Sequence, residues 1–288
     1  MKIFYLILAH HQLNRLDKLI TALNHEHAQF ILHVDKKADI REIKELRKKY
    51  QGKVVLIRRR FDIAWGGYNM VKATLSLIRK AVKESEKGYL VLLSGEDFPL
   101  KSADHIYDGL HENYGVEYIE HFALPDPRWS MNGGLDRINY YWHIDELKRE
   151  GSFTTYIDQQ QTGHVRPYFE GIIPCGGSQW WCITFECAKY ILRFLKTNKI
   201  YEEYYKYCYI PDEMFFQTLI LNSPFKHNVM NNNLRYIDWE SGPQFPKELT
   251  MHDLDSLVKS GKFWARKFKD AVGVTVISEI EKDLGLPL

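Results

Sequence analysis

The chain of 288 residues contains no long uninterrupted hydrophobic run, so it lacks the roughly 18 or more consecutive apolar residues of a transmembrane helix. The apolar run over residues 3–9 is short, breaks at His10 and is followed by no small-residue cleavage site. We therefore expect a buried strand there and not a signal peptide. Neither sign of charge is in excess, because the net charge is only +2, and this bulk charge gives no indication of nucleic-acid binding.

Cysteine is scarce, and its spacing matches no zinc site. The four cysteines, Cys175, Cys182, Cys187 and Cys208, form no C-x-x-C pair. Without an export signal, reduced thiols and a cytoplasmic location are expected, with peripheral association with the inner membrane as an alternative.

Glycine-rich phosphate loops are also missing. The sequence contains neither G-x-G-x-x-G nor G-x-x-x-x-G-K-[ST], and the nearest feature is Trp65-Gly66-Gly67. Two glycines alone do not make a phosphate-binding loop. The absence of both motifs speaks against a dinucleotide-dependent oxidoreductase and against a P-loop kinase.

The first third of the chain alternates regularly between apolar runs and segments of helical spacing. We predict strands over residues 2–9, 29–35, 53–57 and 88–94, and helices over residues 15–23, 39–50 and 68–84. This alternation predicts an α/β fold with a mostly parallel central sheet flanked by helices, in one domain spanning residues 1–288. Ligands of such sheets bind beyond the carboxyl ends of the strands, where His33-Val34-Asp35 and Ser94-Gly95-Glu96-Asp97 would lie.

The second half is less regular. Residues 122–168 are rich in Pro, Trp, Asn, Gly and Gln, and we expect long loops and short pieces of structure there. A strand is predicted over residues 179–184 and helices over 187–196 and 211–221. Residues 253–283 have two helical stretches, with residues 261–269 between them or within the first.

Two pairs of carboxylates stand at positions suited to chemistry. Pro211 fits the first turn of a helix, so Asp212 and Glu213 would lie at the positive end of its dipole, on a rigid element. The alternative is that they only cap and charge the helix. Glu96 and Asp97 follow a buried strand but are adjacent, so they do not form the Asp-x-Asp that holds a divalent cation against a diphosphate. One of them could bind a sugar hydroxyl while the other braces the loop, and an acidic turn is the alternative.

Without a metal, cationic side chains must neutralise a leaving diphosphate. Arg235 and the pair Arg266-Lys267 are the candidates, the pair being set among aromatic residues. A solvated basic face is the alternative for this pair. His33 and Asp35 have no further ligands at a recognisable metal-site spacing, so no metal is expected.

Seven motifs, taken in order, resemble those of one family. They are Ala9-His10, His33-Val34-Asp35-Lys36-Lys37, Trp65-Gly66-Gly67, Leu93-Ser94-Gly95-Glu96-Asp97-Phe98-Pro99-Leu100-Lys101, Gly177-Ser178-Gln179-Trp180, Pro211-Asp212-Glu213 and Ala265-Arg266-Lys267-Phe268. The set resembles the core-2/I-branching β-1,6-N-acetylglucosaminyltransferase family, which also holds the peptide O-xylosyltransferases. The match extends over nearly the whole chain in the family's order.

This resemblance implies a GT-A-type fold and inverting, metal-independent transfer from a UDP-sugar donor. It implies that Glu213 is the catalytic base and that Arg266 and Lys267 hold the diphosphate, with Arg235 as a helper. The remaining site residues follow by position: His33, Val34, Asp35 and Trp65 beside the nucleotide, Glu96 and Asp97 beside the donor sugar, and Trp180 and Asp212 beside the acceptor.

The resemblance is incomplete in two respects. Vertebrate members carry a membrane anchor, a stem and several disulfides, whereas this chain starts at its first strand, so a bacterial member is expected. Residues 122–168, where an acceptor should lie, match nothing in the family's pattern. We expect transfer of N-acetylglucosamine from UDP-N-acetylglucosamine to a glycan hydroxyl. Another UDP-sugar, such as UDP-xylose, and a catalytically silent glycan-binding relative are the alternatives.

Overall fold

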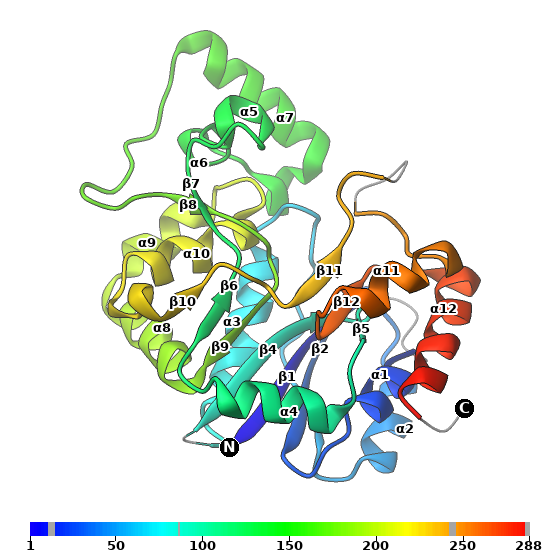
Figure 1. The fold of residues 1–288 in the computed structure, drawn as a ribbon. Coiled ribbons are helices and arrows are strands. Elements are labelled where there is room, and N and C mark those ends of the chain that lie inside the picture. Colours follow the sequence, from blue (N-terminus) through cyan, green and yellow to red (C-terminus); the bar gives the residue numbers. More distant parts are fainter. Residues whose placement is uncertain (11–14, 86, 242–245, 286–288) are drawn as a thin grey trace.

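A seven-stranded, mostly parallel sheet forms the centre of the computed structural model, which describes residues 1–10, 15–85, 87–241 and 246–285 (Figure 1). In spatial order its strands are β10 (Val229–Met230), β6 (Glu117–Ile119), β9 (Trp181–Thr184), β4 (Gly88–Ser94), β1 (Lys2–Ala9), β2 (Ala28–Val34) and β3 (Val54–Leu56). β1 to β4 are parallel, β9 runs antiparallel to both β4 and β6, and β10 is parallel to β6.

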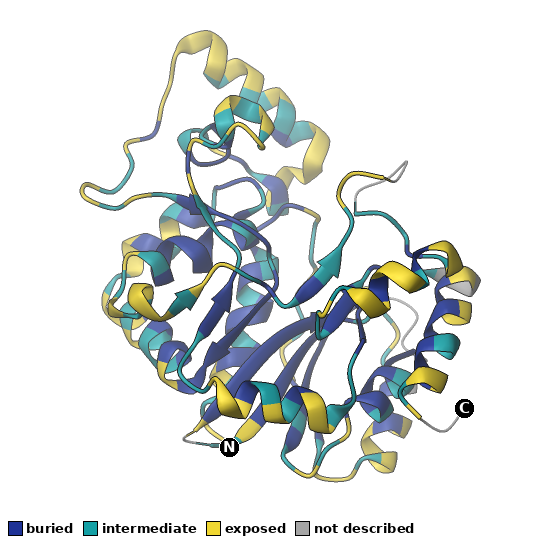
Figure 2. Cartoon of the chain, viewed as in Figure 1, coloured by how far each residue is buried: buried dark blue, intermediate teal, exposed yellow. Residues whose placement is uncertain are grey.

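Helices cover both faces of this sheet, as the unbroken apolar runs of its strands require. Along β1, Ile3, Tyr5 and Ile7 point into one core, whereas Phe4 and Leu6 point into the other. The first core is covered by α1 (Leu16–Ala22), α2 (Arg41–Lys49), α4 (Ala103–Glu112), α11 (Leu254–Lys259) and α12 (Asp270–Asp283). The second is covered by α3 (Asn69–Ala81), α8 (Phe185–Thr197), α9 (Lys199–Tyr205) and α10 (Phe215–Leu221). Figure 2 shows the strands buried and the outer helix faces exposed.

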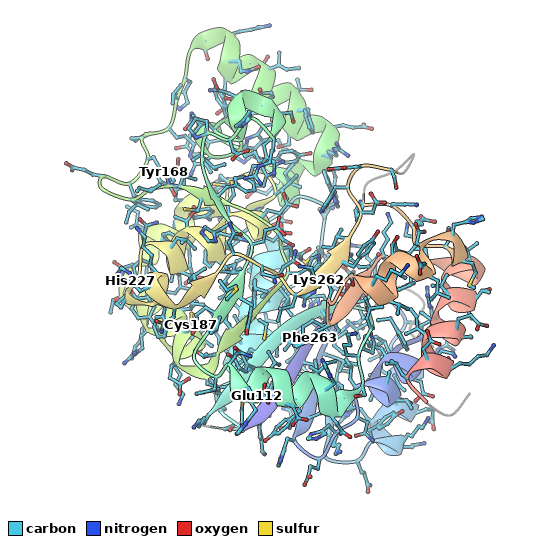
Figure 3. All side chains as sticks on the ribbon, viewed as in Figure 1. Glu112, Tyr168, Cys187, His227, Lys262 and Phe263 are labelled. Atoms are coloured by element: carbon cyan, nitrogen blue, oxygen red, sulfur yellow. The ribbon has the colours of Figure 1, made fainter. Side chains whose placement is uncertain are left out.

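A small sheet lies beside the carboxyl end of the central one. Its order is β11 (Arg235–Ile237), β12 (Trp264–Arg266) and β5 (Phe98–Pro99). β12 pairs in parallel with β11 and antiparallel with β5. The segment 261–269 therefore separates the two helical stretches, and its core is a strand. Figure 3 labels Lys262 and Phe263, which lead into β12.

The segment 122–168 is more regular than the sequence predicted. After β7 (Phe122–Ala123), which pairs with β8 (Cys175–Gly176), come α5 (Ser130–Gly133), α6 (Asp136–Asn139) and the long helix α7 (Ile144–Thr162). The prediction of loops was wrong for α7, whose hydrophobic contacts are few and whose Lys148 has a left-handed φ of 65°. Trp142 and Tyr209 stack at 4.7 Å and attach α7 to the rest of the chain.

The predicted helix over residues 211–221 is divided. Pro211–Glu213 form a 3₁₀ turn, Met214 is non-helical, and α10 begins only at Phe215. Further 3₁₀ turns span Pro224–Asn228 and Met251–Asp253. Ile210, just before the first turn, adopts a left-handed φ of 50°, a conformation that is costly for a β-branched residue.

The predicted α/β class with a mostly parallel, helix-flanked sheet is confirmed. All four cysteines are buried and free. None of the helices in the described parts of the chain has both the length and the apolarity needed to cross a membrane.

Candidate active site

The strands β1, β2 and β4 end at one edge of the sheet. Ala9 is in register with Val34, and Leu8 with Ser94, so the polar residues that follow β2 and β4 lie at the same edge. The structure therefore brings together the two polar strand ends that the sequence singled out.

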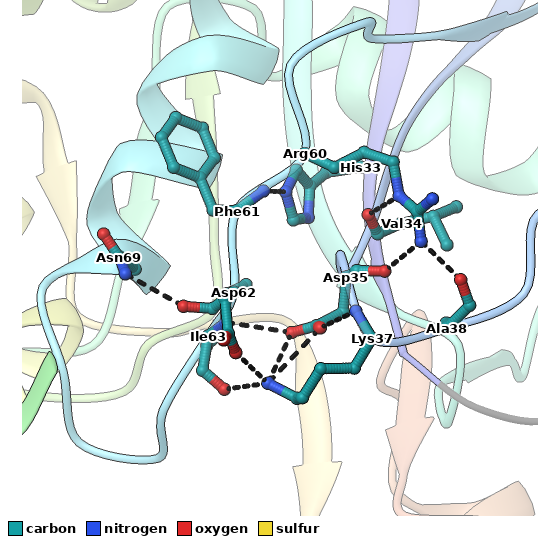
Figure 4. Close-up of polar contacts among 10 residues, drawn as sticks. All are labelled: His33, Val34, Asp35, Lys37, Ala38, Arg60, Phe61, Asp62, Ile63 and Asn69. Atoms are coloured by element: carbon teal, nitrogen blue, oxygen red, sulfur yellow. Dashed lines mark hydrogen bonds and ion pairs between the residues drawn. The ribbon is translucent and has the colours of Figure 1, made fainter. Parts of the chain in front are cut away.

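His33 and Asp35 shape this edge from within (Figure 4). The backbone N–H of Phe61 donates to His33 Nε2 at 3.0 Å, and burial lowers the pKa of His33 to about 4. Asp35 accepts hydrogen bonds from the backbone N–H groups of Lys37 and Ile63, at 2.8 and 3.1 Å. Both side chains, like Val34, are buried. They hold the segment after β3 against the end of β2 and form the wall of the site.

Asp97 braces the turn after β4. It accepts a hydrogen bond from the backbone N–H of Ser94 and forms a 3.2 Å ion pair with Arg266 Nε. Burial raises the pKa of Asp97, while Arg266 and Arg235 oppose that rise. Glu96 lies further from this guanidinium, 3.7 Å from Nη2.

Arg235 and Arg266 come from the adjacent strands β11 and β12. The guanidinium of Arg266 lies 4.4 Å from the ring centroid of Trp180, and that of Arg235 lies 5.9 Å from it. Arg235 is buried and donates to the carbonyl groups of Asn233 and Leu92, and these hydrogen bonds tie β11 to β4. Burial lowers its pKa to about 10. The ring of Trp180, a residue expected beside the acceptor, thus packs against both arginines.

Lys267 is only 8% exposed. Its ammonium has no hydrogen-bond or ion-pair partner among the described residues. Burial lowers the pKa of Lys267, and the nearby charge of Lys269 lowers it further. Arg266, in contrast, is paired with Asp97 and Glu96. The two cations lie next to each other in the chain and are suited to an anionic ligand, because charge-assisted hydrogen bonds to phosphate are strong.

Glu213 is a partly exposed carboxylate on the 3₁₀ turn, with its side chain 23% exposed. Its Oε2 accepts a 2.8 Å hydrogen bond from Arg137 Nη1. Burial raises the pKa of Glu213, whereas Arg137 and, more weakly, Arg266 lower it. The positive charge of Arg266 therefore acts on the carboxylate of Glu213. Asp212 is buried, and burial together with Glu213 raises its pKa to about 7.

Arg137, on α6, is a residue that sequence reasoning missed. Its guanidinium lies 3.7 Å from the ring centroid of Trp129. Nothing in the sequence places either residue near Glu213, because both belong to the irregular region 122–168. Glu120 was also missed, and its charge raises the pKa of Glu213.

Trp65 lies at the outer end of this region. It is 60% exposed, and its ring packs edge-on against Tyr209 with the Arg149 guanidinium 4.5 Å from its centroid. The backbone N–H of Ile210 donates to Gly66 O at 2.9 Å, which ties the Trp65 loop to the segment before Glu213. No group of three or more His, Cys, Asp or Glu side chains that could hold a metal occurs among the residues described.

The chain is similar to known proteins over most of its length. The family model for the core-2/I-branching enzyme matches residues 3–257. The chain therefore belongs to the core-2/I-branching enzyme family, a family of glycosyltransferases. Family membership and the sheet topology together confirm the expected GT-A-type fold.

Xylosyltransferases are among the similar curated proteins. Xylosyltransferase oxt of Drosophila pseudoobscura pseudoobscura is 23% identical over 97% of this chain and 33% of its own length. Human xylosyltransferase 2 is 25% identical over 83% of this chain and 26% of its own length. The chain thus spans a third or less of these relatives. Among solved structures, the crystal structure of S. aureus TarS 1-349 aligns with 80% of this chain and 57% of the TarS chain. The sequence identity is 13% and the TM-score 0.37.

Proposed function

We propose that this chain is an inverting, metal-independent glycosyltransferase that transfers a sugar from a UDP-sugar to a hydroxyl of a glycan acceptor. The observation that carries the proposal is the position of Glu213. One of its oxygens is held by Arg137, and the carboxylate lies within the electrostatic influence of the cationic strand β12. A base and a leaving-group site facing one space are what single-displacement transfer requires.

The proposed reaction uses each group once. Glu213 takes the proton of the acceptor hydroxyl as its oxygen forms a bond to the anomeric carbon on the face opposite the nucleotide. The bond between that carbon and the β-phosphate oxygen breaks, and its electron pair leaves with UDP. Arg266 and Lys267 stabilise the negative charge that develops on the diphosphate.

The environment of the carboxylates supports the metal-independent form of this proposal. Asp97 is already engaged by Ser94 and Arg266, so that it is neutralised from within the protein. Lys267 supplies a second positive charge beside Arg266, with no ion-pair partner in the part of the chain that the structure describes. These cations would fill the role that a divalent ion has elsewhere in GT-A-type enzymes.

N-acetylglucosamine is the donor sugar that we propose first, because the family takes its name from acetylglucosaminyl transfer. Xylose is the second candidate, because the similar curated proteins are named xylosyltransferases. Glu96 would contact the sugar, and His33, Val34, Asp35 and Trp65 would border the nucleotide. Asp212 would lie on the acceptor side.

Slow hydrolysis of a panel of UDP-sugars tests the proposal before any acceptor is known. UDP release should exceed the Glu213→Gln background for one sugar above the others, and the preferred sugar identifies the donor. If no UDP-sugar is hydrolysed while glycans bind, the chain is a silent glycan-binding relative and the proposal fails.

A further inference from the structure

Trp129 is held in a slot formed by two glycines. A Cβ atom on Gly134 would lie 2.5 Å from Trp129 Cε3, and one on Gly176 would lie 2.6 Å from Trp129 Cη2. Phe122 closes the slot edge-on, with ring centroids 5.0 Å apart. Since even a methyl group on either glycine would clash with the indole, the position of Trp129 is tightly specified.

The backbone turns sharply between Trp129 and Arg137. Met131, Asn132, Gly133 and Gly134 all have positive φ, from 56° to 87°. Four consecutive left-handed residues, two of them not glycine, are costly and persist only where the surroundings enforce them. The turn brings the chain back so that Arg137 lies on the face of Trp129.

Arg137 is tied to the segment of the proposed base at two points. Its guanidinium stacks on Trp129 and donates from Nη1 to Glu213 Oε2. Its backbone carbonyl accepts a 2.9 Å hydrogen bond from the N–H of Tyr209, four residues before Glu213. The side chain of Arg137 is 11% exposed, so its charge is poorly screened by solvent.

We propose that Arg137, seated on Trp129, is a positioning residue that keeps Glu213 ionised and oriented with Oε1 as the proton-accepting atom. Oε2 is occupied by Arg137, while Oε1 accepts no hydrogen bond from any residue that the structure describes. The region 122–139 thus acts on the reaction through the base, whatever acceptor the enzyme uses. This inference rests on the proposed function of Glu213.

The charge of Arg137 has a measurable consequence for the base. An adjacent cation stabilises the carboxylate, and a change in such a contact shifts a pKa by about one to three units. Loss of Arg137 should therefore raise the pKa of Glu213 and reduce its ionised fraction near neutral pH. A residue that only stabilised the fold would lower the amount of active protein without moving this pKa.

The test measures the pH dependence of donor hydrolysis in Arg137→Ala, Arg137→Lys, Trp129→Leu and Trp129→Phe. We expect Arg137→Ala to move the acid limb of kcat upward by about one to three pH units, and free guanidinium to reverse part of the shift. In Arg137→Lys the acid limb should lie close to its position in the parent, because the positive charge is kept. The maximal kcat should remain below that of the parent, because an ammonium cannot stack on the indole as a guanidinium does. The acid limb should move further upward in Trp129→Leu than in Trp129→Phe, because phenylalanine keeps an aromatic face for the guanidinium.

Arg128→Ala is the matched control. Arg128 lies next to Trp129, is exposed, stacks over Phe122 at 4.1 Å and pairs with Asp126, without contact to Glu213. Its replacement should leave the acid limb in place. An unmoved acid limb in Arg137→Ala, or equal shifts in Arg128→Ala, would overturn the inference.

A second readout is independent of activity. The resonance of the side-chain carboxyl carbon of Glu213 reports the ionisation of this residue directly. It can be assigned in ¹³C-glutamate-labelled protein by comparison with Glu213→Gln. It should titrate at higher pH in folded Arg137→Ala than in the parent. If the parent hydrolyses no UDP-sugar but this shift is found, the proposed function fails and the positioning role stands. If hydrolysis is found and the resonance does not shift, only the positioning role fails.

Discussion

The backbone N–H of Gly177 donates to the backbone carbonyl of Glu213 at 2.9 Å. This contact joins the segment between β8 and β9, which carries Trp180, to the turn that carries the proposed base. A Cβ on Gly177 would lie 1.9 Å from the carbonyl oxygen of Glu120, so no other residue fits there without moving the backbone. A main-chain hydrogen bond and a side-chain one, from Gln217 Nε2 to Ser178 O at 2.6 Å, thereby join the segment of Trp180 to that of the proposed base.

Glu213→Gln should lower donor hydrolysis at least about 100-fold, because general-base catalysis is worth roughly 10²–10⁴-fold. Affinity for UDP should change little, since the amide is isosteric and lies outside the cationic pair. Steady-state kinetics and calorimetric UDP titration measure the two effects. Glu203→Gln, at an exposed position on α9, is the control and should behave as the parent. Near-normal turnover in Glu213→Gln would show that the base is another residue.

Lys267→Met removes one positive charge and keeps the length of the side chain. If Lys267 contacts the diphosphate, loss of a charge-assisted hydrogen bond worth roughly 1.5–3 kcal/mol should weaken UDP binding by about one to two decades. Folding stability should hold or rise, because burial already disfavours the charged form of this lysine. Calorimetric titration and thermal unfolding give both quantities.

Uridine is the internal control for this variant, because it lacks the phosphates and should bind parent and variant equally. Lys259→Met, which removes an exposed ammonium paired with Asp255, should leave UDP affinity unchanged. Equal UDP affinity in Lys267→Met and the parent would remove Lys267 from the diphosphate site. Arg266→Ala is less informative, because it would also leave Asp97 buried and unpaired.

Donor hydrolysis should persist in EDTA at the rate seen without it. The expectation follows from Arg266 and Lys267 taking the part of a metal ion at the diphosphate. The comparison requires chelator-treated enzyme with and without added Mn²⁺. Activity that disappears in EDTA and returns with Mn²⁺ would contradict the metal-independent mechanism.

Glu117 should make stability depend on pH. This fully buried carboxyl accepts hydrogen bonds from the N–H and hydroxyl of Thr184, and burial raises its pKa to about 7. The folded state therefore holds its proton more tightly than the unfolded state, where the pKa is about 4.5. Its contribution to stability is full below pH 4.5 and is lost as the pH rises through 7.

Glu117→Gln isolates this contribution, because glutamine does not titrate. Between pH 5 and pH 8 the unfolding free energy of the parent should fall relative to that of the variant by up to about 3 kcal/mol, from roughly 1.4 kcal/mol per pKa unit. Urea unfolding at both pH values measures the difference. Parallel pH profiles would mean that Glu117 titrates alike in both states. A constant offset between the proteins would report only the exchanged hydrogen bond.

Several elements follow from local sequence pattern. The predicted strand over residues 88–94 coincides with β4, and the predicted strand over residues 2–9 coincides with β1. Both are buried on two faces, so that their apolar runs are unbroken and their ends are marked by polar residues. The candidate residues Glu96 and Asp97 were found because they directly follow such an end.

Other features depend on contacts that local pattern does not contain. The helix predicted from Pro211 is interrupted because Ile210 and Gly177 constrain the turn through long-range backbone hydrogen bonds. The segment around Arg266 is a strand because it pairs with β11 and β5, far away in sequence. Arg137 reaches Glu213 only through a turn of left-handed residues, which no periodicity reveals.

The pairing of β5 with β12 has a consequence for biosynthesis. Phe98, which follows the polar end of β4, pairs with Ala265. Ala265 is synthesised much later, together with Arg266 and Lys267. A nascent chain that has emerged only as far as α10 already contains β1 to β4 and Glu213, but neither Arg266 nor Lys267. If Arg266 and Lys267 hold the diphosphate as we propose, donor binding becomes possible only late in translation, shortly before α12 is made.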